Sequence, residues 1–335
     1  MQPGLVLVAG PNGAGKTNLL ESLHVGTQGF SPRTRSDASL IRFGAEGARV
    51  ALAGDRAGSP VELDVVLRQR EAKRATLNGA RLQSSEQLRS EIATLVFTPD
   101  RLVVVKGGPA ARRAYFDRAL ARTLPARSSA PTEYAAALAQ RNASLRGVAG
   151  GFSSPESLAP WTQRVAELGA LLVTARQRVI ELLEPRFAER AAELGLPAAS
   201  LRYDGEPPSL AGLEERLERD LDRGSTGIGP HLDDVAILAG ERDLRSFGSQ
   251  GEQRLTVLAL LLAEAELVAE QRRVTPLLLL DDVLSELDPD RRRILAGRLR
   301  AYGQSVITTT SPAALPDEPD QLLQVAASPK GTCVT

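Results

Sequence analysis

Runs of apolar residues and alternating apolar and polar positions predict most of the secondary structure of this chain. Residues 48–82 alternate between apolar and polar, and Asn78-Gly79 is a hairpin signal, so antiparallel strands are expected there. Short continuous apolar runs, by contrast, are typical of buried strands, and four occur at 5–9, 93–97, 277–280 and 305–308.

Helical spacing dominates the middle of the chain and returns near its end. In the helix expected to start at Trp161 and to end before Pro185, apolar residues follow steps of four and three, which is typical of a coiled-coil seam of about three heptads. Such a helix could project as a short arm or pack on a globular core. The seam residues are Trp161, Val165, Leu168, Leu172, Ala175, Val179 and Leu182. Other helices are expected at 84–91, 132–146, 213–223, 252–271 and 291–301.

These elements predict an α/β protein in which strand–loop–helix units at both ends flank a helical insertion. The expected division is 1–111 for the first part, 112–224 for the insertion and 225–335 for the last part. A chain of 335 residues is long enough for one large domain or two ordinary ones.

Composition excludes several classes of protein. No window approaches the roughly 20 apolar residues of a membrane span, and no charged-then-apolar leader precedes the first strand, so we expect no membrane association and no secretion. A single cysteine, Cys333, can form no internal disulfide, which suits the cytoplasm. His24, His231 and that cysteine cannot build a usual zinc site. The net charge is zero, so binding to nucleic acid would need local groups such as Arg112-Arg113 and Arg291–Arg293.

The most specific chemical signal is G-x-x-x-x-G-K-T, which follows the first apolar strand and opens a helix. This context predicts a phosphate-binding loop, because glycines let backbone N–H groups wrap phosphates and the helix N-terminus adds positive charge. Lys16 would reach the β- and γ-phosphates of ATP, and the Thr17 hydroxyl would bind Mg²⁺. The residues expected to bind nucleotide here are Gly10, Pro11, Asn12, Gly13, Ala14, Gly15, Lys16, Thr17 and Asn18.

A second part of the site is expected where the apolar run 277–280 ends in Asp281-Asp282. At the carboxyl end of a parallel strand, Asp281 can hold the Mg²⁺ hydration shell opposite Thr17. Asp282 is then placed as the catalytic group that orients or deprotonates an attacking water, with Lys16 as the other catalytic residue. The alternative is a pair of strand-capping aspartates.

Ser249-Gln250-Gly251-Glu252 precedes this strand and opens the apolar helix 252–271. A serine at a helix N-terminus beside a glycine is a plausible phosphate clamp, and an ordinary N-cap is the alternative. Ser285–Asp288 follows Asp282 at once and resembles the loop through which paired ATPase heads touch.

The order of these features resembles that of ATP-binding-cassette heads, and more narrowly the SMC-like heads of DNA repair proteins. Several phrases, spread over roughly residues 4 to 311, resemble the RecF family: 10–21, 40–44, 97–102, 106–117, 140–142, 229–234 and 279–288.

The resemblance implies an ABC-type, SMC-like P-loop ATPase head with a mixed β-sheet and an inserted, mainly helical arm. It also implies a slow, Mg²⁺-dependent ATPase that binds single-stranded or gapped DNA and dimerises with ATP. With RecO and RecR such proteins help load RecA at gaps, and they are needed for SOS induction. The nucleotide of one copy would be closed by Ser249, Gln250, Gly251, Glu252 and Asp288 of a second copy.

The sequence departs from the family at two places and from transporter cassettes at a third. Family members usually carry β-structure ahead of the loop, whereas Met1 lies almost at the strand here, so a misassigned start or a truncated chain is expected. Leu232 stands where the family tends to carry arginine. Thr308–Thr310 lacks the switch histidine of transporter cassettes, as RecF proteins also tend to do.

Three other functions compete with a DNA-repair switch. A transporter ATPase subunit disagrees with the long insertion, the missing histidine and Asp282 in place of a glutamate. An SMC-type tether would need a far longer coiled coil. A DNA clamp that binds ATP without useful turnover would differ only in its rate of hydrolysis.

Overall fold

The computed structural model describes residues 1–34, 36–56, 58–328 and 331–335, and they form two compact units. Unit 1 comprises residues 1–101 and 268–335, and unit 2 comprises residues 102–267. These limits differ from the three-part division expected above, which stays a prediction of functional parts. The difference arises at residues 102–111 and 225–267, which both belong to unit 2. In the second stretch, strand β8 (Asp234–Ala239) pairs with β7 (Ala199–Asp204) inside the expected insertion.

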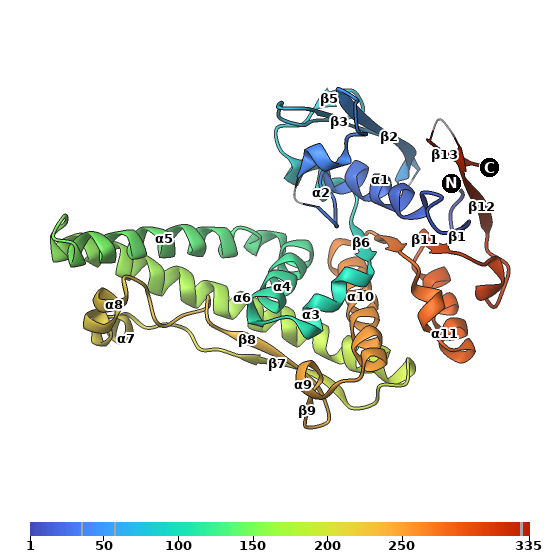
Figure 1. The fold of residues 1–335 in the computed structure, drawn as a ribbon. Helices are drawn as coiled ribbons and strands as arrows, with labels where there is room; N and C mark the ends of the chain where they lie inside the picture. Colours follow the sequence, from blue (N-terminus) through green and yellow to red (C-terminus); the bar gives the residue numbers. More distant parts are fainter. Residues whose placement is uncertain (35, 57, 329–330) are drawn as a thin grey trace. The chain divides into compact units, whose positions relative to one another are not determined.

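Unit 1 is built on a mixed sheet whose strands come from both ends of the chain (Figure 1). All neighbouring strands are parallel except the last pair, β12 and β13, which is antiparallel. Every residue of the central strand β1 is buried, which explains its unbroken apolar sequence. The strand order is β13 (Gly331–Val334), β12 (Gln321–Ser328), β1 (Leu5–Ala9), β11 (Ser305–Thr309), β10 (Leu277–Leu280) and β6 (Thr94–Phe97). The strands predicted from the four apolar runs are confirmed.

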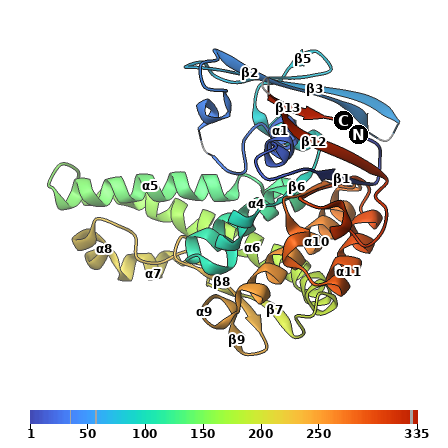
Figure 2. The same cartoon turned by 45° about the vertical axis from the view of Figure 1, so that its right-hand side comes forward.

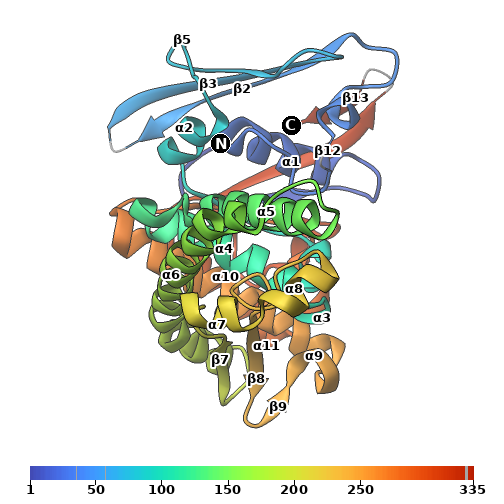
Figure 3. The same ribbon diagram turned by 90° about the vertical axis from the view of Figure 1, so that its left-hand side faces the viewer.

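Helix α1 (Lys16–Gln28) lies between this sheet and a second, antiparallel one (Figure 3). Leu20 packs with the parallel strands, and Val25 packs with Leu63, Val65 and Leu67 of the antiparallel sheet. That sheet runs β2 (Gly47–Arg56), β3 (Ser59–Arg68), β4 (Arg74–Leu77) and β5 (Ala80–Arg81), with α2 (Ser85–Glu91) after it.

The predicted Asn78-Gly79 hairpin is confirmed. Both residues have positive φ, 48° and 81°, as a tight two-residue hairpin turn requires. Helix α11 (Pro289–Ala301) follows β10 in unit 1, and a short 3₁₀ turn, η5 (Val283–Glu286), joins the two.

Unit 2 is mainly helical, and its axis is α6 (Ala159–Glu193), which lies beside α5 (Ala130–Ala149) (Figures 1 and 2). The prediction that this helix ends before Pro185 is wrong. A proline inside a helix costs about 3 kcal/mol, but Phe187 and Ala191 beyond it are fully buried and Arg190 is ion-paired to Glu266. Tertiary packing therefore carries the helix through the proline.

The predicted seam is buried within unit 2 from Val165 to Val179, whereas Trp161 and Leu182 at its two ends are half-buried. Val165, Leu168 and Leu172 pack with Tyr134 and Ala137 of α5 and form one apolar cluster. Other stripes of α6 are buried as well, including Val173, Ile180 and Leu183. The helix is therefore covered on more than the single face that a two-stranded coiled coil would use.

Two other expectations about unit 2 need correction. The helix expected at 213–223 is two short helices, α7 (Leu210–Glu215) and α8 (Leu217–Arg223), which meet at Arg216. The small sheet of β7, β8 and β9 (Arg242–Asp243) was not predicted. The remaining helices are α3 (Val103–Lys106), α4 (Pro109–Thr123), α9 (Leu244–Phe247) and α10 (Gln250–Arg272), the last of which contains the boundary between the units. Within the described ranges, no helix combines the length and apolarity needed to cross a membrane.

Candidate nucleotide-binding site

The phosphate loop connects β1 to α1 and needs glycine for two reasons. Gly13 and Gly15 have positive φ, 79° and 101°, which only glycine adopts without strain. A Cβ added to Gly15 would also come within 2.0 Å of the Thr332 hydroxyl on β13. The loop thus presents backbone at the start of α1, where the N-terminal amides and the helix dipole favour an anion.

Lys16 lies inside the loop rather than in solvent. Its side chain is 8% exposed, and its ammonium donates to the carbonyls of Gly10 at 2.8 Å and Pro11 at 3.0 Å. A positive charge held among neutral carbonyls has no opposite charge in these contacts. A phosphate in the loop would supply one.

Thr17 and Asp281 meet across the edge of the sheet, as predicted. The Thr17 hydroxyl is 3.1 Å from both carboxylate oxygens of Asp281. These groups fit Mg²⁺, which is commonly held by one or two protein oxygens plus phosphates and water rather than by an all-protein cage. Among the described residues there is no cluster of three or more histidine, cysteine, aspartate or glutamate side chains suited to a metal.

Asp282 has an unusual conformation for a non-glycine residue, with φ 49° and ψ 33°. Such left-handed geometry costs about 1–3 kcal/mol and persists only where surrounding contacts enforce it. Its N–H donates to the Thr308 hydroxyl at 2.9 Å, and its carbonyl accepts from the Ser285 hydroxyl at 2.9 Å. Within the described residues, its Oδ1 is buried without a hydrogen-bond partner. An acceptor oxygen in that state is suited to orienting a water molecule.

The predicted clamp residues lie in unit 2 and start helix α10. The Ser249 N–H donates to the Glu252 carboxylate at 2.8 Å, and the Glu252 N–H donates to the Ser249 hydroxyl oxygen at 3.2 Å. This is a reciprocal capping box. Because the serine oxygen accepts, its own proton remains available for an incoming phosphate. Gln250 and Gly251 form the exposed first turn between them.

Glu252 is also paired with Arg242 at 2.8 Å. The hydrogen bond from Arg242 and those involving Ser249 lower the pKa of Glu252 to about 2. The carboxylate at the start of α10 is therefore charged at neutral pH and partly neutralised by the guanidinium.

Asp288 caps α11 by accepting from the N–H of Arg291 at 2.9 Å, and the two side chains form an ion pair. Its expected role toward a nucleotide stays a prediction. Asn18, another expected nucleotide ligand, is exposed on the first turn of α1.

The structure brings Gly10–Thr17, Asp281 and Asp282 together because β1 and β10 end at the same edge of the parallel sheet. The structure adds Thr308 to this site. In the sequence, Thr308 was notable only because the stretch 308–310 lacks the switch histidine. The only signal in the sequence was its position at the end of the apolar run 305–308, because the place of that strand between β1 and β10 is visible only in the structure.

One proposed DNA-binding group is not available. The Arg112 side chain is 4% exposed, and it forms a bidentate pair with Asp234 at 2.7 and 2.6 Å. Its neighbour Arg113 donates to the carbonyl of Asp233 at 2.5 Å. The prediction that Arg112 contacts DNA is therefore wrong, because its guanidinium is buried in unit 2 and paired with Asp234. Arg291 and Arg293, by contrast, form exposed ion pairs on α11 with Asp288 and Asp290.

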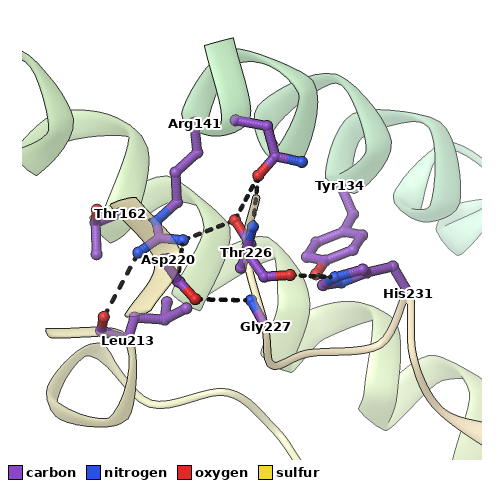
Figure 4. A network of polar contacts seen from close by, with 9 residues as sticks. Tyr134, Arg141, Thr162, Leu213, Asp220, Thr226, Gly227 and His231 are labelled. Atoms are coloured by element: carbon purple, nitrogen blue, oxygen red, sulfur yellow. Dashed lines mark hydrogen bonds and ion pairs between the residues drawn. The ribbon is translucent and has the colours of Figure 1, made fainter. Parts of the chain in front are cut away.

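Two family-like phrases, 140–142 and 229–234, meet around Thr226 (Figure 4). Arg141, with no exposed surface, binds Asp220 at 2.8 Å and the Thr226 hydroxyl at 2.7 Å. His231 contacts the Thr226 carbonyl at 3.0 Å and the Tyr134 hydroxyl at 2.8 Å, and burial lowers the pKa of this histidine. These residues hold the loop before β8, while Leu232 next to them is exposed.

Comparison with known proteins agrees with this architecture. The family model for the RecF/RecN/SMC N terminal domain matches residues 1–333. Two relatives are each called DNA replication and repair protein RecF. The protein from Myxococcus xanthus is 36% identical, and the alignment covers 92% of this chain and 85% of that protein. The protein from Anaeromyxobacter dehalogenans strain 2CP-C is 39% identical, and the alignment covers 94% of this chain and 90% of that protein.

A solved structure of the recombination mediator protein RecF with ATP, in the RecFOR pathway, is also similar. It is 28% identical, has a TM-score of 0.87, and the alignment covers 97% of this chain and 90% of that one. The resemblance and the SMC-like α/β head fold predicted from the sequence are both confirmed. The chain therefore belongs to the RecF family.

Proposed function

We propose that this chain is a DNA replication and recombinational repair protein that uses ATP as a switch. Its relatives are named for replication and repair, and the solved relative is a recombination mediator with ATP. In this proposal the chain binds ATP with Mg²⁺, dimerises around the nucleotide, binds single-stranded or gapped DNA and hydrolyses ATP slowly.

The observation that carries the proposal is the contact of Thr17 with Asp281 beside the buried Lys16. Lys16 and the loop amides bind the β- and γ-phosphates, and Thr17 and Asp281 hold the metal side. A bound Mg²⁺ would neutralise charge on the phosphate oxygens. Asp282, through its unpartnered oxygen, orients the attacking water.

The proposal of an ATP-dependent homodimer is supported by the capping box at Ser249, whose hydroxyl proton has no acceptor in that box. A helix N-terminus prepared in this way suits the γ-phosphate of a second copy.

Partnership with RecR and RecO, and indirectly with RecA, follows from family membership, as does a role in SOS induction. A DNA substrate makes the cytoplasm the expected compartment.

Lys16→Ala tests the nucleotide site. We expect loss of ATP binding and of DNA-stimulated hydrolysis, because no other side chain places a cation inside the loop among the described contacts. Binding is measured by calorimetry and hydrolysis by phosphate release. Lys73→Ala is the matched control, since Lys73 is a surface lysine of unit 1 paired with Asp37 at 3.1 Å. A Lys16→Ala protein that binds and hydrolyses ATP like the parent would refute the proposal.

A further inference from the structure

Thr308 occupies a buried position between the two aspartates of the candidate site. It lies in β11, next to Val8 of β1 in register, and has no exposed surface. Its hydroxyl donates to Asp281 Oδ1 at 2.7 Å and accepts the N–H of Asp282 at 2.9 Å.

A hydroxyl has one proton to donate and lone pairs to accept with, so both contacts form at once. The donated proton fixes the rotation of the Asp281 carboxylate, which also faces Thr17. The accepted N–H fixes one side of the left-handed Asp282, and Ser285 fixes the other by donating to its carbonyl. One threonine thereby orients the metal-side carboxylate and the backbone of the water-side carboxylate.

We propose that Thr308 is a positioning residue that holds Asp281 for the metal and Asp282 for the attacking water in a single geometry. This inference rests on the proposed ATPase function. It predicts that loss of the Thr308 hydroxyl affects metal-dependent nucleotide binding and turnover together, since both aspartates lose the same partner.

The adjacent Thr309 offers a matched control on the same strand. It is also buried, at 2% exposure, but its hydroxyl exchanges hydrogen bonds only with the backbone of Ser311, among the contacts of the described residues. Thr309→Val therefore removes a buried hydroxyl of the same strand without touching either aspartate.

The experiment compares Thr308→Val, Thr308→Ser and Thr309→Val. For each protein, binding of a fluorescent ATP analogue is titrated with Mg²⁺, and single-turnover hydrolysis is measured at saturating Mg²⁺. For Thr308→Val we expect the half-saturating Mg²⁺ concentration to rise about tenfold and turnover to fall at least about tenfold, the size expected for losing a hydrogen bond to a charged group. Binding measured without Mg²⁺ should stay within about twofold, because Lys16 and the loop are unchanged. Thr308→Ser should restore both parameters.

Equal effects of Thr308→Val and Thr309→Val, or a normal Mg²⁺ response in Thr308→Val, would overturn the inference. Where Thr308→Val does not fold, the near-isosteric pair Thr308→Ser and Thr308→Cys gives the same comparison, with only the serine expected to match the parent. Failure of the proposed function looks different, since the parent itself would then show no Mg²⁺-dependent ATP binding.

Discussion

At the scale of single residues, the two adjacent aspartates of the site differ in geometry. Asp281 accepts hydrogen bonds from Thr17 and Thr308 and is 9% exposed. Asp282 is held in a left-handed conformation, with one buried carboxylate oxygen unpartnered among the described residues. In the proposed site, Asp281 would therefore serve the metal side, and Asp282 has an acceptor oxygen available for water.

This difference predicts that the two amide variants lose different steps, hydrolysis in one and Mg²⁺-dependent binding in the other. Asp282→Asn should keep Mg²⁺-dependent ATP binding within about twofold and lower single-turnover hydrolysis by about 100-fold or more, within the range attributed to general acid–base groups. Asp281→Asn should weaken the Mg²⁺-dependent part of binding itself, since an amide is a poorer ligand for the metal and its hydration shell.

Nucleotide titrations and single-turnover assays on the two proteins check this prediction. Each variant is the other's control, because both replace one carboxylate oxygen on neighbouring residues. If Asp282→Asn lost binding while Asp281→Asn kept it, the two roles would be reversed.

At the scale of secondary-structure elements, the start of α10 carries a charge that needs a partner. Glu252 completes the capping box but places a carboxylate where the proposed dimer would receive a phosphate. Arg242, which lies on β9, pairs with that carboxylate. The ion pair therefore joins β9 to the start of α10 across the short helix α9.

Arg242→Ala should weaken the ATP-dependent dimer about two- to fivefold, since exposed ion pairs are worth roughly 0.2–1 kcal/mol. Glu252→Gln in the same chain should restore it, because glutamine can still accept from the Ser249 N–H without adding a charge. Dimer dissociation constants from light scattering or sedimentation give the measurement, and ATP binding to the monomer is the control. No rescue by Glu252→Gln would show that Arg242 acts otherwise.

Moderate acid cannot neutralise Glu252 in the way that Glu252→Gln does. The folded-state pKa of Glu252 is lowered to about 2, so the stabilisation from its charged form is complete above the ordinary value of 4.5 and is lost only as the pH falls through about 2. The dimer should therefore show no transition from this group between pH 6 and about 8.

At the scale of the whole molecule, a net charge of zero makes any DNA affinity depend on local cationic groups. Burial of Arg112 removes one group that the sequence suggested, while Arg291 and Arg293 remain partly exposed on α11. Their carboxylate partners, Asp288 and Asp290, would have to yield to DNA phosphates.

We expect affinity for gapped DNA, measured with ATP present, to fall by orders of magnitude between about 50 and 200 mM salt, as several phosphate contacts require. We expect Arg293 to contact a DNA phosphate, so replacing it with alanine should reduce the salt slope by about one. Arg178→Ala on α6 provides a control of similar exposure, since Arg178 forms a comparable exposed pair with Glu181. An affinity independent of salt would exclude binding through the DNA backbone.

The sequence by itself determined those features whose chemistry is local. Short contiguous patterns predicted the glycine loop with its lysine, and the apolar strand that ends in two aspartates. The structure contains both, with Gly13 and Gly15 at positive φ and residues 277–280 in the parallel sheet. Asn78-Gly79 likewise specifies its own turn.

Only the tertiary structure decided features that depend on residues far apart in the chain. Thr308 gains its role because β11 lies between β1 and β10, an order that no local pattern encodes. Helix α6 passes through Pro185 because burial beyond the proline outweighs its cost, and Arg112 is withdrawn from solvent by Asp234, 122 positions away in the chain. In helix α6 the burial of apolar side chains outweighs a local preference. At Thr308 and Arg112, residues distant in the chain supply the hydrogen-bond partners, so no local pattern could reveal them.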